Sequence, residues 1–218
     1  MNILIAAATP TEIAPFLEEY RYRGADFLHE VDVLITGIGL TAATYSISKQ
    51  VQLKRPDLII QAGIAGCFDT SIPLGTVVVV KKEIIADQAV IQAKEWKTLF
   101  DLELLSPNQR PYTNRWLINK SDILRKIKLK KVTAISINEI STSPQKINWY
   151  KELFNPITES MEGAALHYVA LMENIPFLQL RAISNYIGER NKANWNFRDS
   201  IHNLNHQLSK LLSPKRKV

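Results

Sequence analysis

The alternation of short apolar runs with segments of helical periodicity constrains this chain more than any other feature. Most of the runs are apolar at both odd and even positions, which is typical of strands covered on both faces. They are NILIAAA (2–8), VDVLIT (31–36), DLIIQA (57–62), TVVVV (76–80), VTAISI (132–137) and PFLQLRAIS (176–184). The segments between them, such as TEIAPFLEEY and TAATYSISKQVQL, have the apolar spacing of helices. The alternation predicts an α/β fold with a parallel or mixed sheet between helices.

The length of 218 residues suits one domain, because a split would leave two small cores. We therefore expect one domain over 1–218, with a disordered basic tail at 213–218. The opening MNILIAAATP lacks the basic region and cleavage site of a signal peptide, and no apolar run reaches the roughly 18 residues of a membrane helix. The single cysteine, Cys67, fits a reducing cytoplasm and excludes a cysteine-based zinc cluster. We expect a cytoplasmic protein without a membrane partner.

The net charge of +6 is concentrated in the segments KIKLKK and PKRKV. Short basic runs of this kind are usually solvated surface, and no aromatic residues interleave with them as in nucleic-acid-binding motifs. We expect no nucleic-acid partner, although the charge could draw small anions toward a cleft. The four histidines show no spacing typical of zinc ligands, so we expect neither a metal nor a cofactor. Leu102–Arg115 is rich in Pro, Asn and Arg, which predicts a long surface loop or lid.

Ligands of α/β sheets bind beyond the carboxyl ends of the strands, so the residues that follow each run are candidates for a site. After the first run, Thr9, Pro10 and Glu12 form a helix-start pattern that explains Glu12 without catalysis. The same pattern places a carboxylate at the mouth of the sheet. The glycines of TGIGL and QAGIAGC allow a ligand to approach the backbone, but tight packing explains them equally well.

Two polar residues later in the chain occupy comparable places. Glu162, in ESMEGAAL, lies at the start of a helix, where the helix dipole favours any carboxylate. Asn185 follows the last apolar run and, read alone, is either a turn former or a site residue. Each residue therefore has an interpretation that requires no function.

Taken in order, the segments ATPTE, TGIG, AGIAG, SMEGAA and RAISN resemble the nucleoside phosphorylase and nucleosidase superfamily over nearly the whole chain. The most specific piece is MEGAA followed about twenty residues later by RAISN. The resemblance implies a single three-layer α/β domain whose central mixed sheet is partly curled into a barrel. It also implies a small-molecule nucleoside as ligand, and a homodimer or larger homo-oligomer in which a partner residue closes the pocket.

The resemblance implies a role for each matching residue. In the nucleosidase branch, the glutamate at the position of Glu12 activates a water molecule. The glutamate at the position of Glu162 holds the ribose hydroxyls, and the methionine at the position of Met161 lies against the sugar. The sequence therefore predicts Glu12 as the catalytic base and Glu162 and Met161 as ribose-binding residues.

Further residues are implied on the base side of the site. The residue at the position of Asn185 reads the purine edge, and it is assigned here as catalytic because it assists departure of the base. Ser184 precedes it and is assigned to substrate binding. Small residues at the positions of Ala65 and Gly66 lie along the base, and Ile140, in INEISTSP, is the expected contact from that segment.

The residue types also bear on the nucleophile and on the purine. A carboxylate at Glu12 would repel phosphate, and neither ATPTEI nor QAGIAGC contains an arginine to bind it, which favours water. Adenine-specific relatives carry Asp at the position of Asn185. An amide can donate to the carbonyl oxygen and ring nitrogen of hypoxanthine, so Asn185 favours a 6-oxopurine.

The continuation SNYIGERNKANW resembles the futalosine hydrolase family. That resemblance implies cleavage of futalosine to hypoxanthine and dehypoxanthinylfutalosine in menaquinone biosynthesis, with Arg190 as a candidate partner for the substrate carboxylate. The chain departs from the adenine-specific branch also at Leu40 and Gly163, which we expect not to touch the chemistry. Three alternatives stay open: a methylthioadenosine/S-adenosylhomocysteine nucleosidase, a phosphate-dependent purine nucleoside phosphorylase, and a non-catalytic purine-binding protein.

Overall fold

Helices and strands alternate along the chain in this computed structural model, which describes residues 1–23 and 29–213. The elements are, in order, β1 (Asn2–Ala7), α1 (Pro10–Arg23), β2 (Glu30–Ile35), α2 (Leu40–Leu53), β3 (Leu58–Cys67), β4 (Val77–Ile85), β5 (Ala89–Gln92), β6 (Glu95–Thr98), β7 (Leu117–Ile118), α3 (Asp122–Lys126), β8 (Lys131–Ser136), α4 (Pro144–Phe154), β9 (Thr158–Ser160), α5 (Gly163–Glu173), β10 (Phe177–Tyr186), the 3₁₀ helix η2 (Lys192–Asn194) and α6 (Phe197–Leu212). The predicted α/β alternation is confirmed.

The main sheet closes partly on itself. Its strand order is β10-β4-β8-β9-β3-β1-β2, and an additional pairing of β10 with β3 joins five of these strands into a barrel. β1 and β2 extend the sheet from β3, while β7 pairs with β4. Parallel pairs such as β1 with β3 occur beside antiparallel pairs such as β10 with β4, so the sheet is mixed. The predicted partly barrel-like sheet is therefore confirmed.

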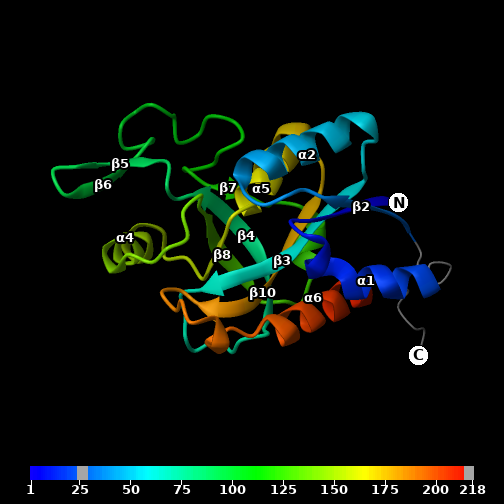
Figure 1. The fold of residues 1–218 in the computed structure, drawn as a ribbon. Coiled ribbons are helices and arrows are strands. Elements are labelled where there is room, and N and C mark those ends of the chain that lie inside the picture. The colour runs from blue at the N-terminus through cyan, green and yellow to red at the C-terminus, as the bar shows by residue number, and fades with distance from the viewer. Residues whose placement is uncertain (24–28, 214–218) are drawn as a thin grey trace.

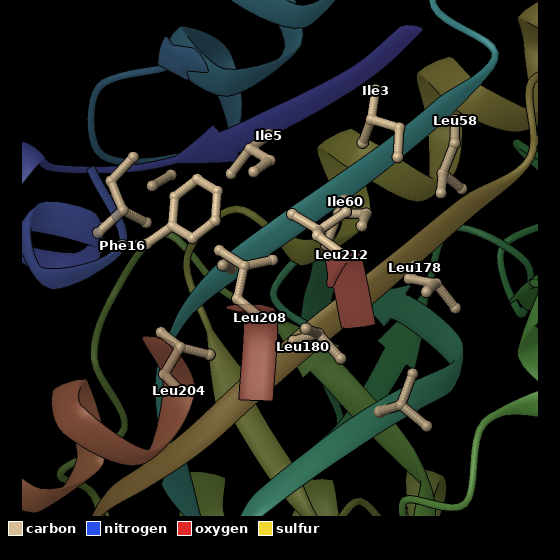
Figure 2. Packing of buried hydrophobic residues seen from close by; sticks show 14 of the residues in the cluster. Ile3, Ile5, Phe16, Leu58, Ile60, Leu178, Leu180, Leu204, Leu208 and Leu212 are labelled. Carbon is tan, nitrogen blue, oxygen red and sulfur yellow. The ribbon is translucent and has the colours of Figure 1, made fainter. Parts of the chain in front are cut away.

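Helices cover both faces of the sheet, as the apolar runs predict. α1 and α6 lie together on one side, and α2 and α5 on the other (Figure 1). On the first side, Leu204, Leu208 and Leu212 of α6 pack with Phe16 of α1 against Ile60 of β3 (Figure 2). The preceding residue of β3, Ile59, packs on the other side of the sheet, in the core cluster that includes residues of α2 and α5. Adjacent residues of one strand thus enter different core clusters, which explains why both are apolar.

Several element boundaries differ from the prediction. β3 runs on to Cys67 and β4 to Ile85, well beyond the apolar runs that predicted them. Asn185 was expected beyond the end of its strand, and this is wrong, because β10 continues to Tyr186. The short strands β5, β6, β7 and β9 and the helices α3 and α4 were not predicted. In the last turn of α6, Leu212 is buried, whereas Leu211 is only partly buried.

Other expectations have mixed outcomes. Residues 102–115 form no regular helix or strand, as predicted, but none of them lines the cavity described below, so the lid interpretation gains no support. In the expected tail 213–218, only Ser213, the C-cap of α6, is described; residues 214–218 lie outside the described part of the chain. Among the described residues, no helix is both long enough and apolar enough to span a bilayer.

Candidate active site

A cavity of about 350 Å³ opens where the strand ends meet. The residues predicted for the site all line it: Glu12, Ala65, Gly66, Ile140, Met161, Glu162, Ser184 and Asn185. They come from segments distant in the sequence, and the barrel closure brings them together because β3, β9 and β10 are neighbours in it. The structure thus brings these residues together around one cavity, while their membership of an active site and their chemical roles stay predictions.

Glu12 is both a capping residue and a lining residue of the cavity. Its Oε2 atom accepts hydrogen bonds from the Thr9 backbone N–H (3.0 Å) and from Thr9 Oγ1 (3.2 Å), and the first of these is the bond that the glutamate of a capping box makes. Its Oε1 atom accepts from the backbone N–H of Ile64 on β3 (3.1 Å). The carboxylate is therefore held from two elements, and Oε1 keeps a lone pair for a further donor.

A side chain of α6 braces the helix that carries Glu12. Asn205 donates from Nδ2 to the Glu12 carbonyl oxygen (2.8 Å) and accepts at Oδ1 from the Phe16 backbone N–H (3.0 Å). It is almost completely buried, so these bonds are shielded from water. Asn205 couples the position of α1 to α6 and thereby helps to fix Glu12 at the cavity.

Glu162 occupies the N-cap position of α5, as its place in the sequence predicts. Its Oε1 atom accepts a hydrogen bond from the backbone N–H of Gly39 (3.0 Å). Gly39 has φ +94°, a conformation that side-chain-bearing residues rarely adopt. The TGIG segment therefore positions a backbone donor for the Glu162 carboxylate, a role that its glycine spacing alone did not reveal.

Arg181, a residue that the sequence reasoning missed, lies behind Glu162. Its side chain is fully buried, with Nη1 at 3.9 Å from Glu162 Oε2 and Nη2 donating to Gln61 Oε1 (2.9 Å). A Cβ atom at Gly63 would lie 2.4 Å from Arg181 Nη1, so the guanidinium fills the space that this glycine leaves. The arginine in an otherwise apolar strand was the available signal, because a buried charge requires a partner.

Two arginines lie near the site, although neither ATPTEI nor QAGIAGC contains one. Arg181 reaches Gly63 from β10, and Arg190 lines the cavity. The absence of arginine from those two motifs therefore does not by itself exclude phosphate. Arg181 itself is not a lining residue, and its terminal nitrogens face Glu162 and Gln61. The case for water therefore depends on the carboxylate of Glu12 rather than on an absence of arginine.

A buried polar cluster lies beneath α5. Glu83 accepts from Gln179 Nε2 (3.0 Å) and from Ser136 Oγ (3.2 Å), and burial raises its pKa to about 7. A Cβ atom at Gly163 would lie 2.4 Å from Glu83 Oε2. The glycine at 163 therefore makes room for this cluster.

His167 of α5 is also buried near this cluster. Burial lowers the pKa of His167 to about 4, so its neutral ring donates from Nδ1 to the Leu117 carbonyl oxygen (2.9 Å).

Asn185 lies inside β10 at a register shift and pairs with Gly66 of β3. Its Oδ1 atom accepts a hydrogen bond from Ser184 Oγ (2.8 Å), and its Nδ2 atom donates to the Tyr186 carbonyl oxygen (3.2 Å). The carbonyl oxygen of Tyr186 can only accept, so it fixes which end of the amide carries the donors. Nδ2 retains a second hydrogen, so Asn185 can donate one bond to a ligand.

Glu159 is a further carboxylate that lines the cavity, and the sequence did not predict it. It lies on β9 with an exposed fraction of 5%, and it accepts hydrogen bonds from the backbone N–H of Ser141 (3.2 Å) and from Ser141 Oγ. Burial raises the pKa of the Glu159 carboxyl, and the bonds from Ser141 oppose that effect. β9 has only three residues, which is too few for an apolar pattern to predict the strand or the directions of its side chains.

The loop after β10 forms another wall of the cavity. Glu189 accepts from the Asn191 backbone N–H and from Asn194 Nδ2, each at 2.6 Å, which organises the turn. The guanidinium of Arg190 lies 5.8 Å from the ring centre of Trp195, within the range of a cation–π contact. Arg190, Trp195 and Phe197 all line the cavity. No group of three or more metal-ligating side chains suited to a metal ion occurs in the described ranges.

Comparisons with known proteins agree with this architecture. The futalosine hydrolase of Thermus thermophilus is 26% identical to this chain, over 94% of this chain and 93% of that protein. A 5′-methylthioadenosine/S-adenosylhomocysteine nucleosidase of Maridesulfovibrio salexigens is 27% identical, over 73% of this chain and 70% of that protein. The native structure of Helicobacter pylori futalosine hydrolase shares the fold, with a TM-score of 0.77, 18% identity and 97% coverage of both chains. The family model of the phosphorylase superfamily matches residues 2–213, and the chain belongs to that superfamily.

Proposed function

We propose that this protein is a purine nucleosidase that hydrolyses the N-glycosidic bond of futalosine to hypoxanthine and dehypoxanthinylfutalosine, as a step in menaquinone biosynthesis. One observation carries the proposal: Glu12, Glu162 and Asn185, a candidate base, a candidate ribose carboxylate and a candidate purine reader, line the same cavity. The similarity to the Thermus thermophilus futalosine hydrolase supports the choice of substrate. The single buried cysteine, Cys67, is consistent with a cytoplasmic enzyme.

Glu12 acts on the nucleophile in this proposal. Cleavage of a nucleoside C–N bond passes through a ribosyl cation-like state, in which water attacks the anomeric carbon as the base departs. Glu12 Oε1 has one bond, from the Ile64 N–H, and can accept a proton from that water. Because a carboxylate at this place repels phosphate, water is the nucleophile that Glu12 favours.

Glu162 acts on the sugar. Its Oε2 atom has no hydrogen-bond donor closer than Arg181 Nη1 at 3.9 Å among the described residues, so it can accept from ribose hydroxyls. A carboxylate at the ribose also stabilises the positive charge that develops on the ring. Met161 supplies an apolar surface beside it.

Asn185 acts on the departing purine. The remaining hydrogen on Nδ2 can be donated to the ring nitrogen-7 of hypoxanthine or shared with its adjacent carbonyl oxygen, which stabilises the negative charge of the leaving base. The carbonyl oxygen of Tyr186 holds the amide in the donating orientation. Ala65, Gly66 and Ile140 form the remaining walls around the base.

Arg190 is proposed to bind the carboxylate of the futalosine side chain. It is exposed and lines the cavity, and its guanidinium lies within cation–π range of Trp195. Among the described residues it forms no ion pair with an acidic side chain. A guanidinium held in this way suits a carboxylate ligand.

A second copy of the chain is proposed to complete the cavity. Ile38 and Ile140 line the cavity while 63% and 45% of their surfaces are exposed. Apolar side chains so exposed beside a site are typical of surfaces that a partner covers. We therefore expect a homodimer or larger homo-oligomer.

The main alternative is cleavage of 5′-methylthioadenosine or S-adenosylhomocysteine, since a nucleosidase named for these compounds is also a relative. Release of free base from futalosine, inosine and methylthioadenosine, each with and without phosphate, separates the candidates. Our proposal expects release of hypoxanthine from futalosine that is fastest of the three and unaffected by phosphate. Faster release of adenine, or a phosphate requirement, would assign the protein to one of the alternatives.

A further inference from the structure

Glu159 and Asn185 lie in one row across three neighbouring strands. Gly66 of β3 pairs with Glu159 of β9 on one side and with Asn185 of β10 on the other. Paired residues of neighbouring strands project from the same face of a sheet. Because adjacent strands lie about 4.8 Å apart, the Cα atoms of Glu159 and Asn185 are separated by about 10 Å. Two polar side chains therefore flank a cavity wall that has glycine at its centre.

The glycine allows Asn185 to lean toward Glu159. A Cβ atom at Gly66 would lie 3.4 Å from Asn185 Nδ2 and 2.5 Å from Ile187 Cδ1. The amide donor and an apolar side chain thus occupy the space over β3. A flat ring packed against Ile187 would have Asn185 at one edge and Glu159 at another, since all three residues line the cavity.

The Glu159 carboxylate has unused acceptor capacity. Its two oxygens receive one bond each, both from Ser141, although each oxygen can accept two. No ion pair to Glu159 is found within the described ranges, and its exposed fraction is only 5%. A buried carboxylate without a cation is costly unless other donors satisfy it. A ligand N–H is the donor that this arrangement lacks.

We infer that Glu159 is a specificity-determining residue that accepts the N1–H of a 6-oxopurine while Asn185 donates its remaining hydrogen to the nitrogen-7 edge of the same ring. The inference rests on the proposed function. Hypoxanthine carries a hydrogen on N1, whereas N1 of adenine has a lone pair that would face the carboxylate. An unpaired polar group costs about 1–3 kcal/mol, or roughly 5- to 150-fold in binding. Glu159 therefore adds to the preference that Asn185 supplies.

Methylation of N1 tests this contact directly, since it removes the hydrogen that Glu159 would accept. The measurements are kcat/KM for futalosine and for N1-methylfutalosine, and the Kd of hypoxanthine and of 1-methylhypoxanthine, on the full chain. Wild type should favour the unmethylated compound by about 100-fold or more. In Glu159→Ala, kcat/KM should fall about 10- to 100-fold for futalosine and change little for N1-methylfutalosine. The preference for futalosine over the methylated compound should therefore fall to about tenfold or less.

Two further variants keep the test decisive. Glu159→Gln retains an acceptor and the size of the side chain, and it should keep most of the preference. Glu139→Ala is the control, because Glu139 is an exposed residue next to Ile140 whose carboxylate pairs with Lys146 outside the cavity. This variant should keep the wild-type kcat/KM and Kd values for both pairs of compounds. Equal binding of hypoxanthine and 1-methylhypoxanthine to wild type, or an unchanged preference in Glu159→Ala, would overturn the inference. A wild type that releases no hypoxanthine from futalosine would instead overturn the proposed function.

Discussion

At the residue scale, Glu12 shows that one side chain can both hold a helix start and line a cavity. Its Oε2 atom accepts from the backbone and hydroxyl of Thr9, and its Oε1 atom faces β3 and the cavity. The bonds from Thr9 are compatible with the proposed catalytic role, because they fix the rotamer and leave an acceptor available. A pattern that explains a residue structurally therefore does not exclude it from a site.

Glu12→Gln should lower turnover on futalosine by about 10²- to 10⁴-fold, because an amide cannot take the proton of the attacking water. Affinity for hypoxanthine should change by less than about fivefold, since the base is bound elsewhere in the cavity. Steady-state kinetics measures the turnover of futalosine, and a direct binding assay measures the affinity for hypoxanthine. Glu18→Gln, the same change at an exposed position of α1, is the control and should leave both values intact. Full turnover in Glu12→Gln would reduce Glu12 to a capping residue.

Asn185→Asp should reduce kcat/KM for futalosine by about 10- to 100-fold, because an ionised carboxylate faces the purine carbonyl oxygen with like charge. The ratio of futalosine to methylthioadenosine cleavage should fall accordingly, and both rates can be followed by release of free base. Ser184 can still donate to the new carboxylate, so the fold around it is preserved. Unchanged hypoxanthine release would remove Asn185 from the site.

Individual site residues were predictable where they belong to ordered motifs. Glu12, Glu162 and Asn185 were predicted because the ordered motifs that contain them resemble those of the superfamily, whereas each residue read alone also had a structural explanation. Arg181 and Glu159 were missed because their significance depends on which strands are neighbours. Spacing within one segment cannot show that Arg181 fills the space left by Gly63, or that Glu159 shares a row with Asn185.

At the element scale, long and short strands differ in how far the sequence predicts them. β1 and β10 carry continuous apolar runs and were located to within about two residues of their ends. β3 and β4 were truncated in the prediction, because their second halves contain small or charged residues such as Gly63 and Glu83. The second half of β3 lines the cavity, whereas the second half of β4 carries Glu83 into the buried polar cluster beneath α5. Departures from the apolar pattern therefore coincide with the cavity in one strand and with a buried polar cluster in the other.

The loop after β10 contributes a charge to the cavity through Arg190. Arg190→Met should raise KM for futalosine about two- to tenfold, the range expected for an exposed ion pair, without changing KM for inosine, which lacks the carboxylate. Steady-state kinetics on the two substrates make the comparison. Lys192→Met, in the same loop but outside the cavity lining, is the matched control. An equal rise in KM for both substrates would show that Arg190 supports the loop rather than the carboxylate.

The cluster around Glu83 predicts a pH dependence of stability. The pKa of Glu83 is raised from 4.5 to about 7 on folding, so its neutral form stabilises the folded state. That contribution is complete below pH 4.5 and is lost as pH rises through 7, by about 2–3 kcal/mol. Glu83→Gln removes this titration. The free energy of unfolding of wild type relative to Glu83→Gln should therefore fall between pH 5 and pH 8, as measured by urea unfolding.

His167 titrates in an overlapping window with the opposite sign. Its pKa is lowered to about 4, so the stability it contributes is present above pH 6.5 and is lost as pH falls through 4. Both proteins contain His167, and the difference between them isolates Glu83. Parallel stability profiles over the whole pH range would contradict the assignment of a raised pKa to Glu83.

At the scale of the whole molecule, barrel closure assembles the site. The pairing of β10 with β3 places Asn185 beside Gly66, and β9 on the other side of β3 brings Glu159 and Glu162 to the same cavity. The sequence predicted a mixed and partly closed sheet only through its family resemblance. Apolar periodicity alone predicts covered strands, but it carries no information on which strands pair at the closure.

The central claim is that water attacks a 6-oxopurine nucleoside in this cavity, and oxygen-isotope labelling tests it most directly. Futalosine is incubated with the enzyme in ¹⁸O-labelled water that contains unlabelled phosphate, and the products are analysed by mass spectrometry. The proposed function predicts free hypoxanthine and dehypoxanthinylfutalosine that carries one ¹⁸O atom on its anomeric carbon. A phosphorylated, unlabelled sugar product, or intact futalosine beside cleaved methylthioadenosine, would contradict it.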